Sequence, residues 1–162
     1  MKFHVFTTDL TGEAYRRFLT VMLEGQAEFS LVWRDQLDFS ASAWAYRERL
    51  APFEISSSRT PRWPGTLLLE GAGVATVNRY ACAVTALDVL TQCPSLFSWH
   101  CPAFPEDLAF YDANGEASFA SIAHEKEAWV LSPSLLPTVS TFVRLAPEDV
   151  DDESARIIRG TP

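Results

Sequence analysis

The sequence predicts an α+β domain, in which a mostly antiparallel sheet carries two or three helices and ends in a C-terminal β-meander. Three observations predict this class. Segments with helical periodicity lie early in the chain, and strand-like segments follow one another late in the chain. The regular alternation of strand and helix that marks a parallel sheet is missing. The expected order is β-α-β-α-β-β-α, followed by the meander.

The N-terminal part of the chain predicts a strand followed by the clearest helix. Residues 2–7 are typical of a short strand. After Thr11, the expected N-cap, apolar residues recur three and four positions apart, as on the buried face of a helix. Gly25 ends this pattern. The residues expected in the core are Tyr15, Phe18, Leu19, Met22 and Leu23.

The next elements follow from alternation and from the prolines. Large apolar residues recur at every second position over 29–34 (Phe29, Leu31 and Trp33), which predicts a strand. Helical spacing predicts a helix over 38–51, and Pro52 stops it. Residues 53–59 are typical of a polar strand. We expect a loop over 60–66, because two prolines and a glycine break a ladder or a helix.

The middle of the chain predicts shorter pieces. Residues 67–69 and 74–80 are strand candidates, separated by two glycines that suit a turn or a bulge. Residues 85–90 suit a short helix capped by Thr85. Residues 95–106 hold three aromatic residues and two prolines, so we expect an irregular connection there.

The last part of the chain predicts the meander. Residues 108–111 and 116–122 are expected to pair as antiparallel strands, because the intervening 112–115 contains Asn-Gly, which tolerates the positive φ of a hairpin turn. Residues 128–131 suit a third strand. We therefore expect a single α+β domain over 1–145.

The last segment, 146–162, is expected to be an acidic C-terminal tail or a short helix. Its acidic residues come first and its basic residues last, which complements a helix dipole.

Composition limits the class of partner. The chain has 162 residues, a net charge of −8 and a sequence pI of about 4.8. The electric field of this negative charge repels nucleic acid and anionic membranes and attracts a basic protein. The same charge also keeps a protein soluble. Three cysteines are an odd and sparse set, and no stretch resembles a signal peptide or a membrane span. We therefore expect a cytoplasmic protein.

Several side chains have the chemistry of metal ligands, but not a familiar spacing. They are Cys93, His100, Cys101, His124 and Glu125. Neither C-x-x-C nor H-E-x-x-H is present. A structural role as buried cysteines and hydrogen-bonded histidines therefore explains these residues as well as a zinc site does. A pair such as Cys101 with His124, or Ser121 with His124, would suit nucleophilic catalysis, but no nucleophile motif surrounds it. We expect no metal and no other cofactor.

Large aromatic side chains in loops suit a binding surface. Trp63, Phe97, Trp99 and Phe104 lie in segments interrupted by prolines, rather than in periodic core stripes. Such rings either line a groove for a partner or pack down as a small core under the loops.

Three short segments share a recognisable pattern. Residues 96–99 read L-F-S-W, residues 105–111 read P-E-D-L-A-F-Y, and residues 121–125 read S-I-A-H-E, with Gly115 between the last two segments. They resemble a group of small bacterial proteins that share the pattern W-x-x-P-x-x-P-E-D-L-x-F, a glycine turn, and S-I-A-H-E. Residues 62–66 resemble another part of that pattern. The resemblance implies a family without an established activity, and it draws attention to four polar residues: Glu106, Asp107, His124 and Glu125.

Two functions remain open. The leading hypothesis is a non-enzymatic protein-binding module, similar in size and charge to immunity and inhibitor proteins. Its candidate binding residues are Trp63, Trp99, Glu106, Asp107, His124 and Glu125. The alternative is a small hydrolase or metalloenzyme that uses His124 and Glu125 with His100 and Cys101. Strand alternation further predicts that His124 hydrogen-bonds Glu106, Asp107 or the 99–107 connection.

Overall fold

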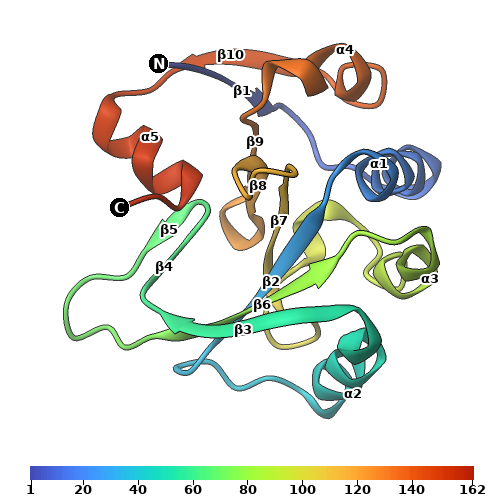
Figure 1. Ribbon diagram of the computed structural model, residues 1–162, viewed down its shortest axis with the longest axis vertical. Coiled ribbons are helices and arrows are strands. Elements are labelled where there is room, and N and C mark those ends of the chain that lie inside the picture. The colour runs from blue at the N-terminus through green and yellow to red at the C-terminus, as the bar shows by residue number, and fades with distance from the viewer.

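The computed structural model describes all residues 1–162 and confirms the α+β class. Eight strands form one antiparallel sheet in the order β10-β1-β9-β8-β7-β2-β6-β3, and β4 and β5 form a separate small ladder (Figure 1). The sheet strands are β1 (Lys2–Phe6), β2 (Glu28–Arg34), β3 (Glu54–Thr60), β6 (Ala75–Ala81), β7 (Glu106–Tyr111), β8 (Ala117–Ile122), β9 (Glu127–Val130) and β10 (Leu145–Asp149). The small ladder consists of β4 (Arg62–Trp63) and β5 (Thr66–Leu67).

The helices are α1 (Gly12–Gly25), α2 (Ala41–Leu50), α3 (Leu87–Leu90), α4 (Leu136–Val139) and α5 (Asp152–Arg159). Figure 1 shows α1, α2 and α3 on one side of the sheet, and α5 with the β4–β5 hairpin on the other. Short 3-10 turns η1 to η5 lie at Ala51–Phe53, Val84–Ala86, Leu96–Ser98, Ala123–Glu125 and Pro133–Leu135. No helix is both long enough and apolar enough to cross a membrane.

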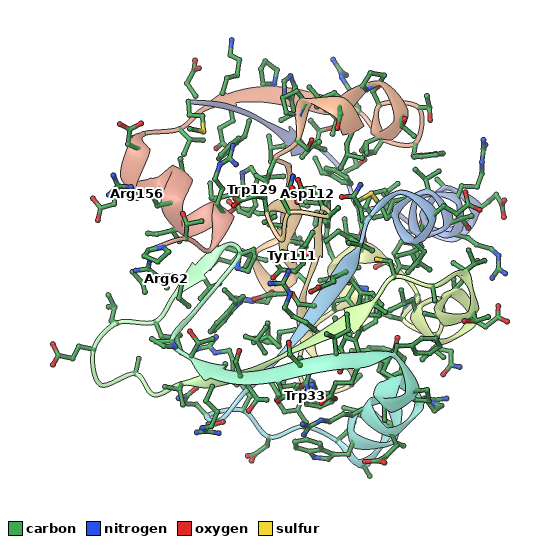
Figure 2. The ribbon with its side chains drawn as sticks, in the orientation of Figure 1. Trp33, Arg62, Tyr111, Asp112, Trp129 and Arg156 are labelled. Atoms are coloured by element: carbon green, nitrogen blue, oxygen red, sulfur yellow. The ribbon has the colours of Figure 1, made fainter.

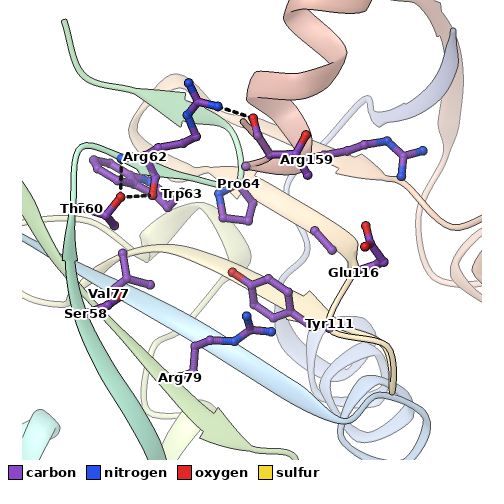
Figure 3. A pocket seen from close by; sticks show the side chains of 14 residues that line it. Ser58, Thr60, Arg62, Trp63, Pro64, Val77, Arg79, Tyr111, Glu116 and Arg159 are labelled. Atoms are coloured by element: carbon purple, nitrogen blue, oxygen red, sulfur yellow. Dashed lines mark hydrogen bonds between the residues drawn. The ribbon is translucent and has the colours of Figure 1, made fainter. Parts of the chain in front are cut away.

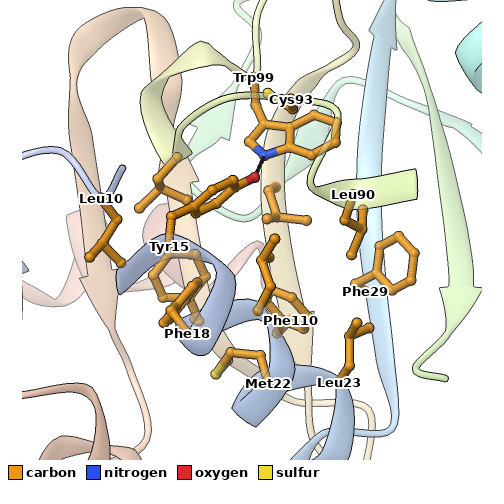
Figure 4. Packing of buried hydrophobic residues seen from close by; sticks show 14 of the residues in the cluster. Leu10, Tyr15, Phe18, Met22, Leu23, Phe29, Leu90, Cys93, Trp99 and Phe110 are labelled. Atoms are coloured by element: carbon orange, nitrogen blue, oxygen red, sulfur yellow. Dashed lines mark hydrogen bonds between the residues drawn. The ribbon is translucent and has the colours of Figure 1, made fainter. Parts of the chain in front are cut away.

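The main core lies between α1, α2, α3 and the sheet. All five residues of the predicted α1 stripe are buried in a cluster of 26 side chains (Figure 4). Phe18 contacts Phe110 and Phe119 edge to face, with ring centroids 6.3 and 5.2 Å apart. The predicted helix is therefore confirmed, although the Thr11 side chain makes no capping hydrogen bond.

Helix α2 is confirmed within the predicted 38–51. Ser40 caps it, because its hydroxyl accepts from the backbone N–H of Ala43 at 3.3 Å. Its buried residues are Ala43, Tyr46 and Leu50. The Tyr46 hydroxyl donates to the carbonyl of Val89 at 2.8 Å and so ties α2 to α3.

The prediction of a loop over 60–66 was wrong in one respect. Arg62 and Trp63 pair with Leu67 and Thr66 to form a short antiparallel ladder. The prolines permit it because Pro61 precedes the ladder and Pro64 lies in its turn. Of the strand candidate 67–69, only its first residue joins a strand.

Helix α5 and the β4–β5 hairpin cover part of the second face. The Asp151 carboxylate caps α5 by accepting from the N–H of Ser154 at 2.8 Å. Ala155 and Ile158 pack in a cluster of ten buried residues on this face. The N–H of Gly65 donates to two carbonyls at the end of α5, at 3.1 Å each. The segment 146–162 thus supplies most of edge strand β10 together with α5.

The meander is confirmed. Strands β7, β8 and β9 are consecutive neighbours in the sheet, and every pairing is antiparallel. The predicted turn over 112–115 is also present: the N–H of Gly115 donates to the carbonyl of Asp112 at 3.0 Å. The side chain of Asp112 accepts a further bond from the N–H of Asn114 at 2.8 Å.

Candidate functional site

The two tryptophans expected to share a binding surface lie on opposite faces of the sheet. Trp99 is fully buried in the main core, where its indole N–H donates to the Tyr15 hydroxyl at 2.8 Å (Figure 4). Phe104 packs against it, with ring centroids 5.8 Å apart. Trp63 is buried in a separate small cluster that includes Val32 and Val77. These rings are packing residues and do not form one groove.

Asp107 is the centre of a buried polar junction. One carboxylate oxygen accepts from the Trp63 indole N–H at 2.9 Å, and the other accepts from the backbone N–H of Ala123 at 3.2 Å. Asp107 has a φ of 54°, which a non-glycine residue adopts only when its surroundings hold it there. The carboxylate therefore fastens the β4–β5 hairpin and η4 to β7.

Burial dominates the ionisation of this carboxyl group. It raises the pKa of Asp107 to about 7, against the opposing effect of the Trp63 hydrogen bond. The neighbouring Glu106 carboxylate raises the pKa of Asp107 further, whereas Ala123 and Arg34 lower it. Glu106 is itself only 3% exposed. It lies 3.9 Å from the Arg34 guanidinium, and one of its oxygens has no hydrogen bond.

The side chains of His124 and Glu125 are exposed and take no part in this junction. Their side chains are 42% and 56% exposed and approach each other to 3.6 Å. The predicted hydrogen bond from His124 to Glu106, Asp107 or the 99–107 connection is wrong. The strand alternation on which it depended ends at η4, and the left-handed Lys126 then turns the chain. The backbone of Ala123, next to His124, makes the contact with Asp107 instead.

The residues of the alternative enzyme hypothesis do not gather into a metal site. His100 Nδ1 lies 2.8 Å from the carbonyl of Cys101, and the Cys101 thiol donates to the carbonyl of Asp38. No three side chains of His, Cys, Asp or Glu come close enough together to hold a metal ion. Burial raises the pKa of the Cys101 thiol, so the ordinary reactive thiolate is disfavoured.

The free edge of the sheet offers a different candidate. Strand β3 lies at one end of the strand order, and six of its seven residues are exposed. The opposite edge, β10, is shorter and carries Pro147 with two acidic residues beside it. Proline and charge on an edge strand discourage pairing with another chain. Strand β3 has no proline, although it carries Glu54 and Arg59 and a bulge lies near its start.

The hydrogen-bond pattern identifies the open backbone groups of β3. The N–H of Asp35 donates to the carbonyl of Val74, so the even-numbered residues of β6 bond to β2. The odd-numbered residues of β6 bond to β3. Because Ser57 and Arg59 lie opposite even-numbered residues, their backbone N–H and C=O groups point to the free edge.

An exposed aromatic platform adjoins this edge. The Trp44 ring is stacked on Trp33, with centroids 4.7 Å apart, and Phe39 packs edge-on against both. Trp44 is 45% exposed. A cavity of about 230 Å³ lies among these rings, and Asp35, the ion-pair partner of Arg59 on β3, also lines it. Figure 2 shows Trp33 near β3 and α2.

Comparison of the chain with family models, with curated proteins and with solved structures found no match.

Proposed function

We propose that this chain is a non-enzymatic binding protein that pairs an extended segment of a basic partner protein with edge strand β3. The observation that carries the proposal is the unpaired backbone edge at Ser57 and Arg59. An extended peptide adds to such an edge through main-chain hydrogen bonds, and neighbouring side-chain sites give it specificity.

The net charge of the chain and the apolar groups beside β3 support this kind of partner. The net charge of −8 attracts a basic protein over long range. The exposed part of the Trp44 ring, which stacks on Trp33 and lies 5.9 Å from the Arg47 guanidinium, offers apolar area beside the edge. Ile55 on β3 is 54% exposed and provides an apolar contact beside the edge.

The proposal is tested by removing one backbone donor without disturbing the sheet. Ser57→Pro deletes an N–H that points to the free edge, and proline is tolerated at such a position. Ser57→Ala keeps the N–H and is the matched control. Peptides selected from a display library on the wild-type chain should be rich in Lys and Arg. They should bind Ser57→Ala normally and Ser57→Pro at least about tenfold more weakly, which is 1.4 kcal/mol.

Two results would overturn the proposal. One is selected peptides that bind Ser57→Pro as tightly as the wild type. The other is a wild-type chain that dimerises through β3, shown by sedimentation and abolished by Ser57→Pro, because the occupant of the edge would then be a second copy. Amide NMR shifts at Ser57 and Arg59 on peptide addition distinguish binding at the edge from binding elsewhere.

A further inference from the structure

A second concave site lies on the sheet face that α5 and the β4–β5 hairpin only partly cover. It is a cavity of about 290 Å³ bounded by β3, β6, β7, the hairpin and the end of α5 (Figure 3). This volume is near the lower end of the range for small-molecule sites. It suits a ligand of a few heavy atoms rather than a nucleotide or a peptide.

Arg79 is the best-prepared binding group in this cavity. Its guanidinium lies 3.6 Å from the centre of the Tyr111 ring (Figure 3). Its Nε lies 2.6 Å from a Glu28 carboxylate oxygen. That Nε–H is not aligned for a hydrogen bond, and the terminal nitrogens have no hydrogen-bond acceptor. The Tyr111 hydroxyl is fixed in turn by Ser30 at 3.0 Å. The Arg79 guanidinium is therefore held in place, while the N–H groups of its terminal nitrogens are free to donate to a ligand.

The cavity lining contains more basic than acidic side chains, although the chain as a whole is acidic and Glu28 offsets the charge of Arg79. Its lining contains three arginines, at 62, 79 and 159, and one acidic residue, Glu116. Neither Arg62 nor Arg159 pairs with a carboxylate. Arg62 donates to the Thr161 carbonyl, whereas Arg159 lies over the Phe3 ring with a buried Nε that has no partner.

We infer that this cavity binds a small oxyanion, a carboxylate or a phosphate, through the terminal nitrogens of Arg79. A planar guanidinium holds two oxygens of such a group at once, and this bidentate pair is stronger and more directional than a single contact. The Ser58 hydroxyl, which lines the cavity and has no hydrogen-bond partner in the protein, supplies a further donor. The site lies over the sheet face, so it is independent of pairing at the β3 edge.

The test is a titration of the full chain with inorganic phosphate and, separately, with acetate. It is followed by NMR at the Arg79 Nε and at the amides of Ser58 and Glu116. Saturable shifts at these atoms are expected in the wild type. Arg79→Gln should weaken binding about tenfold or more, since it removes two charge-assisted bonds. Arg79→Lys should also weaken it, because an ammonium cannot form the bidentate pair.

The matched control is Arg16→Gln, which removes an exposed arginine paired with Asp88 on another part of the surface and should leave binding unchanged. If Arg79→Gln does not fold, Ser58→Phe provides the second test, since a ring at that position fills the cavity and should abolish the shifts. Preference for phosphate identifies a phosphate ligand, and preference for acetate identifies a carboxylate. The inference is overturned if neither anion gives saturable shifts at Arg79, or if Arg16→Gln weakens binding as much as Arg79→Gln.

Discussion

The carboxyl group of Asp107 should make the stability of this protein depend on pH. Its pKa is raised to about 7 in the folded chain and is about 3.9 in an unfolded chain. The group therefore stabilises the fold fully below about pH 4, and this contribution is lost as the pH rises to about 7. A gap of about three pH units, at about 1.4 kcal/mol each, makes the loss about 4 kcal/mol.

Asp107→Asn removes this dependence. Asparagine cannot titrate, and its amide nitrogen must face either Trp63 or Ala123, each of which donates to the carboxylate in the wild type. The loss of one buried hydrogen bond costs about 1–3 kcal/mol at any pH. The variant should thus be less stable than the wild type below about pH 4, and it should gain stability relative to the wild type as the pH rises from 5. It should become equally stable, or more stable, by pH 8.

Urea unfolding followed by the fluorescence of the five tryptophans measures this difference at pH 5, 6, 7 and 8. Asp88→Asn is the matched control, because the side chain of Asp88 is 88% exposed and its removal should shift all four values equally. If the free energies of unfolding of wild type and Asp107→Asn stay parallel across this range, Asp107 does not titrate there. Burial would then not raise the pKa of Asp107 into this range.

Three further substitutions test the packing. Leu19→Ala should cost about 2–5 kcal/mol, measured by the urea midpoint, because Leu19 is fully buried in the main core. Tyr15→Phe leaves the buried Trp99 indole N–H without an acceptor and should cost about 1–3 kcal/mol, seen as a lower melting temperature. Gly160→Ala should cost at least about 1 kcal/mol in the same assay. Gly160 has a φ of 68°, and an added Cβ would lie 2.7 Å from the backbone nitrogen of Pro64.

Sequence patterns were sufficient where the chain's own periodicity decides the structure. The α1 stripe is set by residues three and four positions apart, so it needs no knowledge of the partner surface. The turn over 112–115 is likewise local, because Gly115 adopts a φ of 81° and the Asp112 side chain accepts from the N–H of Asn114. The β4–β5 ladder was missed because a proline blocks a ladder only at a position that must donate, and this depends on which residues pair.

The candidate sites depend on contacts that no local pattern contains. Trp63 and Asp107 lie 44 residues apart and meet only because the hairpin folds over β7. The open edge at β3 follows from the strand order, in which β3 and β10 are the outermost strands. One local signal was available: Trp44 lies off the buried stripe of α2, and a large aromatic residue on the outer side of a helix indicates an exposed ring.

The two faces of the sheet should respond differently to loss of the Asp107 junction. The main core of 26 residues lies on the helix side, whereas the second face holds clusters of ten and four. Trp63 joins the hairpin to Asp107, and Gly65 joins the hairpin to the end of α5. Regions with few buried contacts open at lower free energy than the main core. Weakening the junction should therefore loosen the hairpin and α5 first, along with the arginine-lined cavity that they bound, while α1 and its core stay folded.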